Sequence, residues 1–151
     1  MEVSHWTATF IKWYGAKAFT LFYDVKLPTE AQWEFAARGG AGFIYATADG
    51  NVYGDGTSAI WNFLGENPSR GHVLDVKINE PNPYGLYNMA GNVWEWTADW
   101  FSPDFHVQAV SSQGLRNPVG PESGHARVIK GGSYLCHESS CNRYRVAARS
   151  S

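Results

Sequence analysis

The sequence predicts an α+β domain with two helices, short strands and a large share of irregular loop. Helical spacing of apolar residues covers 7–23 and again the stretch that follows Thr29. Later in the chain, Trp94, Trp96 and Trp100 alternate with smaller residues, as is typical of a strand. Sixteen glycines and seven prolines indicate extensive loops between these elements. At 151 residues, the chain fits a single domain, 1–151, with a core of its own.

The first helix is expected over 7–23, where the apolar positions have helical spacing. They are Phe10, Ile11, Tyr14, Ala18, Leu21 and Phe22. The second helix has clearer boundaries. Thr29 follows a proline and has Gln32 three residues later, which predicts a capping box, and Gly39 and Gly40 are expected to end the helix.

Two further stretches are expected to be irregular. Residues 41–80 lack a clear period and contain scattered glycine, asparagine and serine, which predicts long loops with short strands. Residues 102–130 are rich in proline, serine and glycine and are expected to form a surface loop.

Composition argues against several classes of partner. The net charge of −2 favours neither nucleic acid nor an anionic membrane surface. No apolar stretch reaches the roughly 18 residues that a membrane-spanning helix needs. The N-terminal residues do not resemble a signal peptide, and two cysteines are too few for a disulfide scaffold. We therefore expect a cytoplasmic protein that binds no nucleic acid and no membrane.

The stretch 130–149 has the composition of a functional site. Gly131 and Gly132 indicate a bend, and Cys136 and Cys141 follow it among hydrogen-bonding and basic side chains, including Arg143. Two thiols at this spacing could form a disulfide or redox pair. They could also bind a soft ion such as Cu(I), or be two unrelated free thiols. The residues alone leave these alternatives open.

A second polar cluster lies in the stretch 84–100. Asn88, Asn92 and Glu95 supply side-chain oxygens within eight residues, and Gly91 allows the backbone to turn. Such donors suit calcium, which binds several carboxylate, amide and carbonyl oxygens. A polar turn that leads into an aromatic strand is the alternative.

Three blocks resemble the formylglycine-generating enzymes, also called sulfatase-modifying factors. They are LPTEAQWEFAARGG at 27–40, PNPYGLYNMAGNVWEWTADWF at 81–101 and GGSYLCHESSCNRYRVAARS at 131–150, and the last resembles the active-site segment. The resemblance covers most of residues 10–150. It implies a C-type-lectin-like fold with two helices, a small twisted antiparallel sheet and much irregular loop held by calcium. Compared with the family, the chain is expected to be truncated at both ends.

The resemblance also implies an activity, which is the copper-dependent oxidation of a peptidyl cysteine by O₂. The substrate would be the cysteine of a Cys-x-Pro-x-Arg motif in an unfolded sulfatase polypeptide, and the product Cα-formylglycine. Cys136 and Cys141 would bind Cu(I), and Ser133 would orient groups near the metal. Trp94 and His137 are expected to bind the substrate, and Arg143 either to bind it or to fix the loop.

For calcium, the resemblance implies one structural site and indicates a second. The first would use Asn88, Gly91, Val93 and Glu95; the second would use Asn62 and Phe63, with Asp75 as the candidate acidic ligand.

A second hypothesis is a non-catalytic, lectin-like binding module or fragment on the same scaffold. It is motivated by the short chain and by Ser140, which stands where many family members have a tyrosine before the second cysteine.

Overall fold

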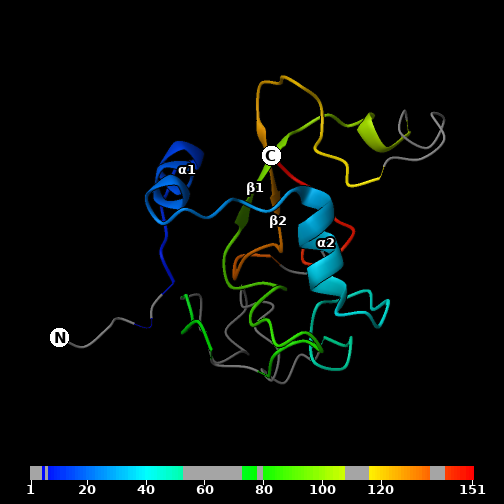
Figure 1. Ribbon diagram of the computed structural model, residues 1–151. Coiled ribbons are helices and arrows are strands. Elements are labelled where there is room, and N and C mark those ends of the chain that lie inside the picture. Colours follow the sequence, from blue (N-terminus) through cyan, green and yellow to red (C-terminus); the bar gives the residue numbers. More distant parts are fainter. Residues whose placement is uncertain (1–4, 6, 53–72, 78–79, 108–115, 137–141) are drawn as a thin grey trace.

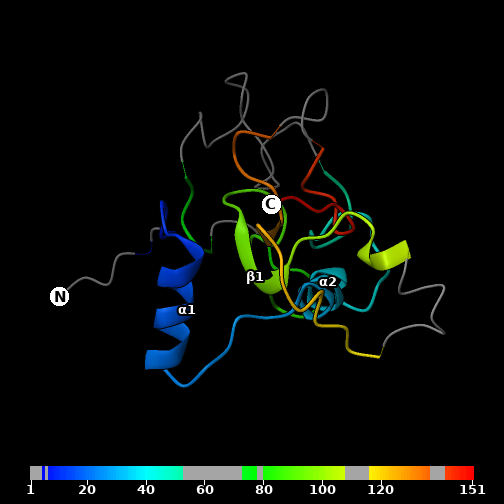
Figure 2. The same cartoon turned by 90° about the horizontal axis from the view of Figure 1, so that it is seen from above.

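The computed structural model describes residues 5, 7–52, 73–77, 80–107, 116–136 and 142–151. Two helices, α1 (Trp13–Phe22) and α2 (Glu30–Arg38), precede two strands, β1 (Glu95–Trp100) and β2 (Arg127–Lys130). In both Figure 1 and Figure 2 the helices lie on opposite sides of the strand pair, and much of the rest of the described chain is loop. The predicted α+β class is confirmed. Neither described helix has the length and apolar character that crossing a bilayer requires.

The sheet is an antiparallel pair of strands with an irregularity in its middle. The aligned pairs are Glu95 with Lys130, Trp96 with Ile129 and Trp100 with Arg127, and the register shifts between the last two. Strand β1 confirms the strand predicted from the alternating tryptophans. The prediction of a surface loop over 102–130 is wrong at the C-terminal end of this range, because residues 127–130 form β2. The short run Arg127–Lys130 becomes a strand through its long-range partner, which local composition does not reveal.

Helix α2 forms as its sequence predicts. The Thr29 hydroxyl accepts a hydrogen bond from the Gln32 amide at 3.2 Å, and the Gln32 side chain accepts one from the Thr29 amide at 2.9 Å. Gly39 ends the helix with a φ of 57°, the left-handed conformation that glycine adopts most readily. Trp33 and Ala37 are buried on the inner face.

Helix α1 begins later than predicted. Its N-cap is Lys12, and Phe10 has a φ of 58°, so the stretch 7–12 is not helical. The Ile11 carbonyl accepts a hydrogen bond from Trp96 Nε1 at 2.9 Å. The positive φ of Phe10 lies outside the right-handed helical region, so the helix cannot extend back through this residue. Within α1 only Thr20 is buried, so most of its apolar side chains face outward.

The core lies between α2, the turn before β1 and the segment around Cys136. Its buried members are Trp33, Ala37, Ala46, Met89, Ala90, Cys136, Tyr144 and Val146, and Trp94 packs against them. Burial of this apolar surface is the main force that holds the loops against α2. The core thus places the cysteine segment beside the tryptophan strand.

A buried ion network ties the end of the described chain to the start of α2. Arg149 donates two hydrogen bonds to the Glu30 carboxylate, at 2.6 and 2.9 Å, and Glu30 is only 3% exposed. Lys130 Nζ lies 3.7 Å from the same carboxylate, and burial lowers the pKa of Lys130 although Glu34 and Glu30 oppose this. Asp99 accepts a hydrogen bond from the Glu30 amide at 2.7 Å. Because a buried carboxylate requires such partners, the network fixes the last residues beside the sheet.

Candidate functional site

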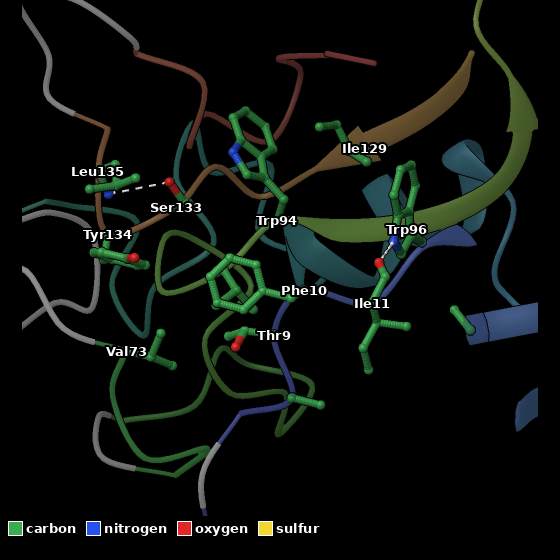
Figure 3. A pocket seen from close by; sticks show the side chains of 13 residues that line it. Thr9, Phe10, Ile11, Val73, Trp94, Trp96, Ile129, Ser133, Tyr134 and Leu135 are labelled. Carbon is green, nitrogen blue, oxygen red and sulfur yellow. Dashed lines mark hydrogen bonds between the residues drawn. The ribbon is translucent and has the colours of Figure 1, made fainter. Parts of the chain in front are cut away.

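An apolar groove of about 470 Å³ opens between the segment before α1, the strands and the stretch 133–135. Figure 3 shows its walls. The lining residues are Ala8, Thr9, Phe10, Ile11, Ala16, Val73, Val93, Trp94, Trp96, Ile129, Ser133, Tyr134 and Leu135. None of these side chains carries a charge. The groove can therefore accept an apolar or extended peptide segment, but it offers no ion pair within this lining.

Two of the residues predicted for catalysis or substrate binding line this groove. Trp94, expected in the wall of a substrate groove, lines it and also packs against the core. Ser133 lines it as well, and its hydroxyl accepts a hydrogen bond from the Leu135 amide at 3.2 Å (Figure 3). The two residues are far apart in sequence and are brought to one surface by the fold.

The bend predicted at the double glycine is present. Gly131 and Gly132 have φ angles of 83° and 74°. A Cβ on Gly132 would lie 3.0 Å from the Tyr144 backbone nitrogen, so both its torsion and its surroundings favour glycine. The chain then turns tightly, with the Cys136 amide donating to the Ser133 carbonyl at 2.9 Å. Cys136 follows the groove-lining stretch 133–135 directly in sequence, but it is buried in the core and does not line the groove.

Cys136 is buried, at 2% exposed, and is disulfide-bonded. Cys141 is the other cysteine of the sequence and lies outside the described residues. Three alternatives were left open for this pair. The alternative that the two cysteines are unrelated free thiols disagrees with a disulfide-bonded Cys136. A disulfide sulfur has no thiolate, so Cys136 could serve Cu(I) after reduction but not in the oxidised state. After reduction, the sulfurs of the two cysteines would be soft donors, which suit a soft monovalent ion such as Cu(I).

The other residues predicted near the substrate are placed only in part. Arg143 is exposed and donates to the Arg149 carbonyl at 2.5 Å, and it does not line the groove. This contact matches the loop-fixing alternative for Arg143. His137 lies outside the described residues.

A second, smaller cavity of about 120 Å³ coincides with the predicted calcium turn. Asn88, Val93 and Glu95, three of the four predicted ligands, line it. The remaining lining residues are Thr7, Val76, Tyr87 and Asn92. Gly91, the fourth predicted ligand, has a φ of 81° and forms the turn between them.

The two asparagines of this turn have different surroundings. Asn92 Oδ1 accepts a hydrogen bond from the Leu74 amide at 2.9 Å, so it already has a partner. Asn88 Oδ1 is buried and has no hydrogen-bond partner among the described residues. A buried amide oxygen without a partner is unfavourable, and a bound cation would satisfy it.

Glu95 places a desolvated carboxylate on the same cavity. Burial raises its pKa from 4.5 to about 7, although a hydrogen bond of 2.5 Å from Trp33 Nε1 favours the charged form. An orphaned amide oxygen and a desolvated carboxylate around one cavity are the hard oxygen donors that calcium prefers. The described residues therefore fit the predicted calcium ion.

The calcium turn and the cysteine segment are hydrogen-bonded to each other. The Gly91 amide donates to the Gly131 carbonyl at 2.7 Å, and the Tyr134 amide donates to the Asn92 carbonyl at 2.8 Å. An ion in the small cavity would therefore rigidify the stretch that forms one wall of the groove.

The second predicted calcium site is largely outside the described residues, because Asn62 and Phe63 fall there. The Asp75 carbonyl accepts a hydrogen bond from Asn88 Nδ2 at 3.2 Å, but Asp75 does not line the first cavity. Within the described part of the chain, no three His, Cys, Asp or Glu side chains gather as a metal site.

Comparison with known proteins places this arrangement in a family. The model of the sulfatase-modifying factor enzyme 1-like domain matches residues 2–151. The chain belongs to this family. A formylglycine-generating enzyme of Streptomyces coelicolor is 49% identical over 148 residues, which cover 93% of this chain but 46% of that protein. The chain thus spans less than half the length of this relative.

Solved structures agree on the fold. Treponema denticola variable protein 1 is 34% identical, with a TM-score of 0.59, over 83% of this chain and 41% of that protein. The structure of PvdO from Pseudomonas aeruginosa is 19% identical, with a TM-score of 0.76, over 99% of this chain and 57% of PvdO. The latter likeness shows the fold alone, and together they confirm the predicted fold class.

For this sulfatase-modifying factor domain, the sequence did not identify several groove residues. Phe10, Val73 and Leu135 line the groove but come from three separate segments. Leu135 was missed because an exposed apolar residue in an irregular segment carries no periodic signal, and Phe10 was missed because its apolar spacing assigned it to the first helix. The positive φ of Phe10 becomes visible only in the folded chain.

Proposed function

We propose that this chain forms the cysteine-bearing half of a formylglycine-generating oxidase. The observation that carries the proposal is the placement of Ser133 and Trp94 on one groove, with Cys136 directly after the lining residue Leu135, in a chain 49% identical to a formylglycine-generating enzyme. The proposed substrate is an unfolded sulfatase segment that contains Cys-x-Pro-x-Arg, and O₂ is the oxidant. The product is a Cα-formylglycine residue.

In this proposal the groove binds and orients the peptide. Its uncharged aromatic wall would exclude water from an extended segment laid along it. The turn closed by the Cys136 amide and the Ser133 carbonyl keeps the cysteine next to the lining residue Leu135. The Ser133 hydroxyl, positioned by the Leu135 amide, would orient the reactive part of the peptide.

The proposed cofactors are Cu(I) and a structural Ca²⁺. Reduced Cys136 and Cys141 would hold copper, which supplies affinity for the substrate sulfur and reactivity toward O₂ when it is bound. Ca²⁺ would bind at Asn88, Gly91, Val93 and Glu95 and hold the groove wall through the Gly91 to Gly131 hydrogen bond.

Copper titration tests the first part of this proposal. Fully reduced protein, titrated anaerobically with Cu(I) against a competing chelator, should bind one ion. Binding should be lost in both Cys136→Ala and Cys141→Ala and kept in Ser133→Ala, because serine is not a soft ligand. A reduced protein that leaves all copper on the chelator contradicts the copper assignment.

The second candidate function is peptide binding without turnover. It is favoured by the burial and disulfide bond of Cys136, which keep its sulfur from acting in the oxidised state. Mass spectrometry of a Cys-x-Pro-x-Arg peptide after incubation with reduced, copper-loaded protein and O₂ separates the two. An aldehyde product supports the oxidase, whereas bound but unchanged peptide supports the binding module.

A further inference from the structure

Helix α1 has an outward side that carries no charged residue. Its exposed positions form the outer face of α1, which consists of Tyr14, Gly15, Ala18, Phe19, Leu21 and Phe22. Phe22 is 82% exposed and Tyr14 is 73% exposed. A helix on a protein surface normally presents charged and polar groups to water, so an uncharged outer face is unusual. A continuous exposed apolar surface of this kind marks a site that another molecule covers.

The opposite side of α1 is fixed to the sheet. Trp13 Nε1 donates a hydrogen bond to the Thr97 carbonyl at 2.8 Å. The Arg127 guanidinium lies 3.8 Å from the Trp13 ring centroid and 3.5 Å from the ring centroid of Trp100, so it contacts both rings. Figure 1 and Figure 2 both show the helix on the side of the strand pair away from α2. The outer face is therefore held in one orientation, and covering it costs little conformational entropy.

The charges at the ends of α1 are opposite to those that an isolated helix favours. The N-cap residue is Lys12, and the first turn contains no acidic residue. Asp24 follows the C-cap residue Tyr23, and the last turn contains no basic residue. Lys12 and Asp24 are both exposed. The helix dipole is positive at the N-terminal end and negative at the C-terminal end, so each charge lies beside a partial charge of its own sign. A partner with an acidic group near Lys12 and a basic group near Asp24 would offset both.

A second copy of the same helix, packed antiparallel, supplies these two groups. Lys12 and Asp24 each lie six residues from Ala18, which belongs to the outer face. When two such helices cross at Ala18, Lys12 of one copy meets Asp24 of the partner subunit, and the reciprocal pair forms at the other end. At the rise of an α-helix the two ion pairs are about 18 Å apart, which leaves the apolar outer faces to pack between them.

We propose that the outer face of α1 is a homodimer interface, in which two copies of this chain pack antiparallel about a two-fold axis at Ala18. The Phe22 ring is buried against the partner, and Lys12 and Asp24 form ion pairs across both ends of the interface. Because the outer face carries no charge, pairing it with itself buries no unpaired charged group. This inference does not depend on the function proposed for the groove.

Sedimentation velocity of the 151-residue chain tests the interface. The proteins are the wild type, Phe22→Ser, Lys12→Glu and the double variant Lys12→Glu/Asp24→Lys. The control is Phe35→Ser, which removes an aromatic ring that is 67% exposed on α2. All of these side chains are exposed, so the variants should keep the fold, which circular dichroism checks.

We expect the wild type to dimerise with a Kd of about 1–100 μM. Phe22→Ser should raise this Kd at least about 100-fold, because a two-fold axis makes the loss of one buried ring count twice. Lys12→Glu should raise it about tenfold, since like charges then meet at both ends. The double variant should return to within about threefold of the wild type, because the same ion pairs form with exchanged signs. Phe35→Ser should dimerise like the wild type.

A wild type that stays monomeric at about 100 μM overturns the proposal. Binding of that monomer to phosphatidylglycerol vesicles would then identify a lipid surface as the occupant of the outer face. A dimer that Phe22→Ser leaves intact, or that Phe35→Ser weakens equally, also overturns the proposal, because its interface lies elsewhere. If Lys12→Glu has no effect, or if the double variant does not regain the lost affinity, the antiparallel arrangement is wrong.

Discussion

Calcium binding to the small cavity can be tested by replacing Glu95 with glutamine. Glu95→Gln keeps an oxygen that can accept the Trp33 hydrogen bond, but it removes the charge that a cation would balance. The structure predicts different responses of the two proteins to Ca²⁺. Without the ion the variant is the more stable protein, and with the ion most of this difference disappears, because Ca²⁺ stabilises the wild type.

The magnitude follows from the pKa of Glu95. A pKa raised from 4.5 to about 7 means that ionising this carboxyl in the folded protein costs about 3 kcal/mol more than in the unfolded chain. Between these two values the folded state binds more protons than the unfolded state, so the stability of the calcium-free protein falls as pH rises from 4.5 through 7. At pH 8 the calcium-free Glu95→Gln variant should therefore be more stable than the wild type by up to about 3 kcal/mol.

Thermal unfolding at pH 8, with EDTA or with Ca²⁺ at about 100 times its dissociation constant, measures both effects. Ligand binding at that excess stabilises the wild type by about 2.7 kcal/mol. For a domain of this size the melting temperature should rise by about 5–11 °C. Glu95→Gln should rise by less than about 2 °C, while Glu122→Gln, which changes an exposed carboxylate, should respond like the wild type. The reasoning is refuted if Ca²⁺ leaves the wild type unchanged, or if Glu95→Gln responds equally.

Two further predictions concern the scaffold of the site. Arg149→Met leaves the buried Glu30 carboxylate without its bidentate partner, and it should lower the free energy of unfolding in urea by about 3–5 kcal/mol; a loss below about 1 kcal/mol would show that the pair is dispensable. Gly132→Ala adds a strained torsion and a methyl group 3.0 Å from the Tyr144 nitrogen, and it should cost about 1–3 kcal/mol more than Gly85→Ala. Gly85 is the matched control because it shares a positive φ and has open space around it, so equal losses in urea unfolding would contradict a steric role for Gly132.

Local chemistry is where sequence-based prediction succeeded. The capping box at Thr29 and the glycine that ends α2 were predicted correctly because hydrogen bonds within a few residues determine them. The bend at Gly131 and Gly132 was predicted for the same reason. The start of α1 was predicted too early, because Phe10 adopts a positive φ that a right-handed helix excludes and that apolar spacing does not reveal.

The candidate site divides in the same way. The residues alone nominated Asn88 and Asn92 equally, and the family resemblance chose Asn88. The fold adds a physical difference, since the Leu74 amide occupies Asn92 Oδ1 while Asn88 Oδ1 has no hydrogen-bond partner among the described residues. The exposure of Phe10 and the burial of Cys136 likewise had no local signature.

By itself, therefore, the sequence determined the family, the two helices, the bend before Cys136 and the oxygen-rich turn that leads into β1. The tertiary structure decided that β2 pairs with β1, that Phe10 shares a groove with Trp94, and that the calcium turn is hydrogen-bonded to the cysteine segment. The physical reason is the sequence separation of the interacting residues. Caps, turns and donor types depend on neighbouring residues, whereas burial, strain and the partner of each buried polar atom depend on segments that meet only when the chain has folded.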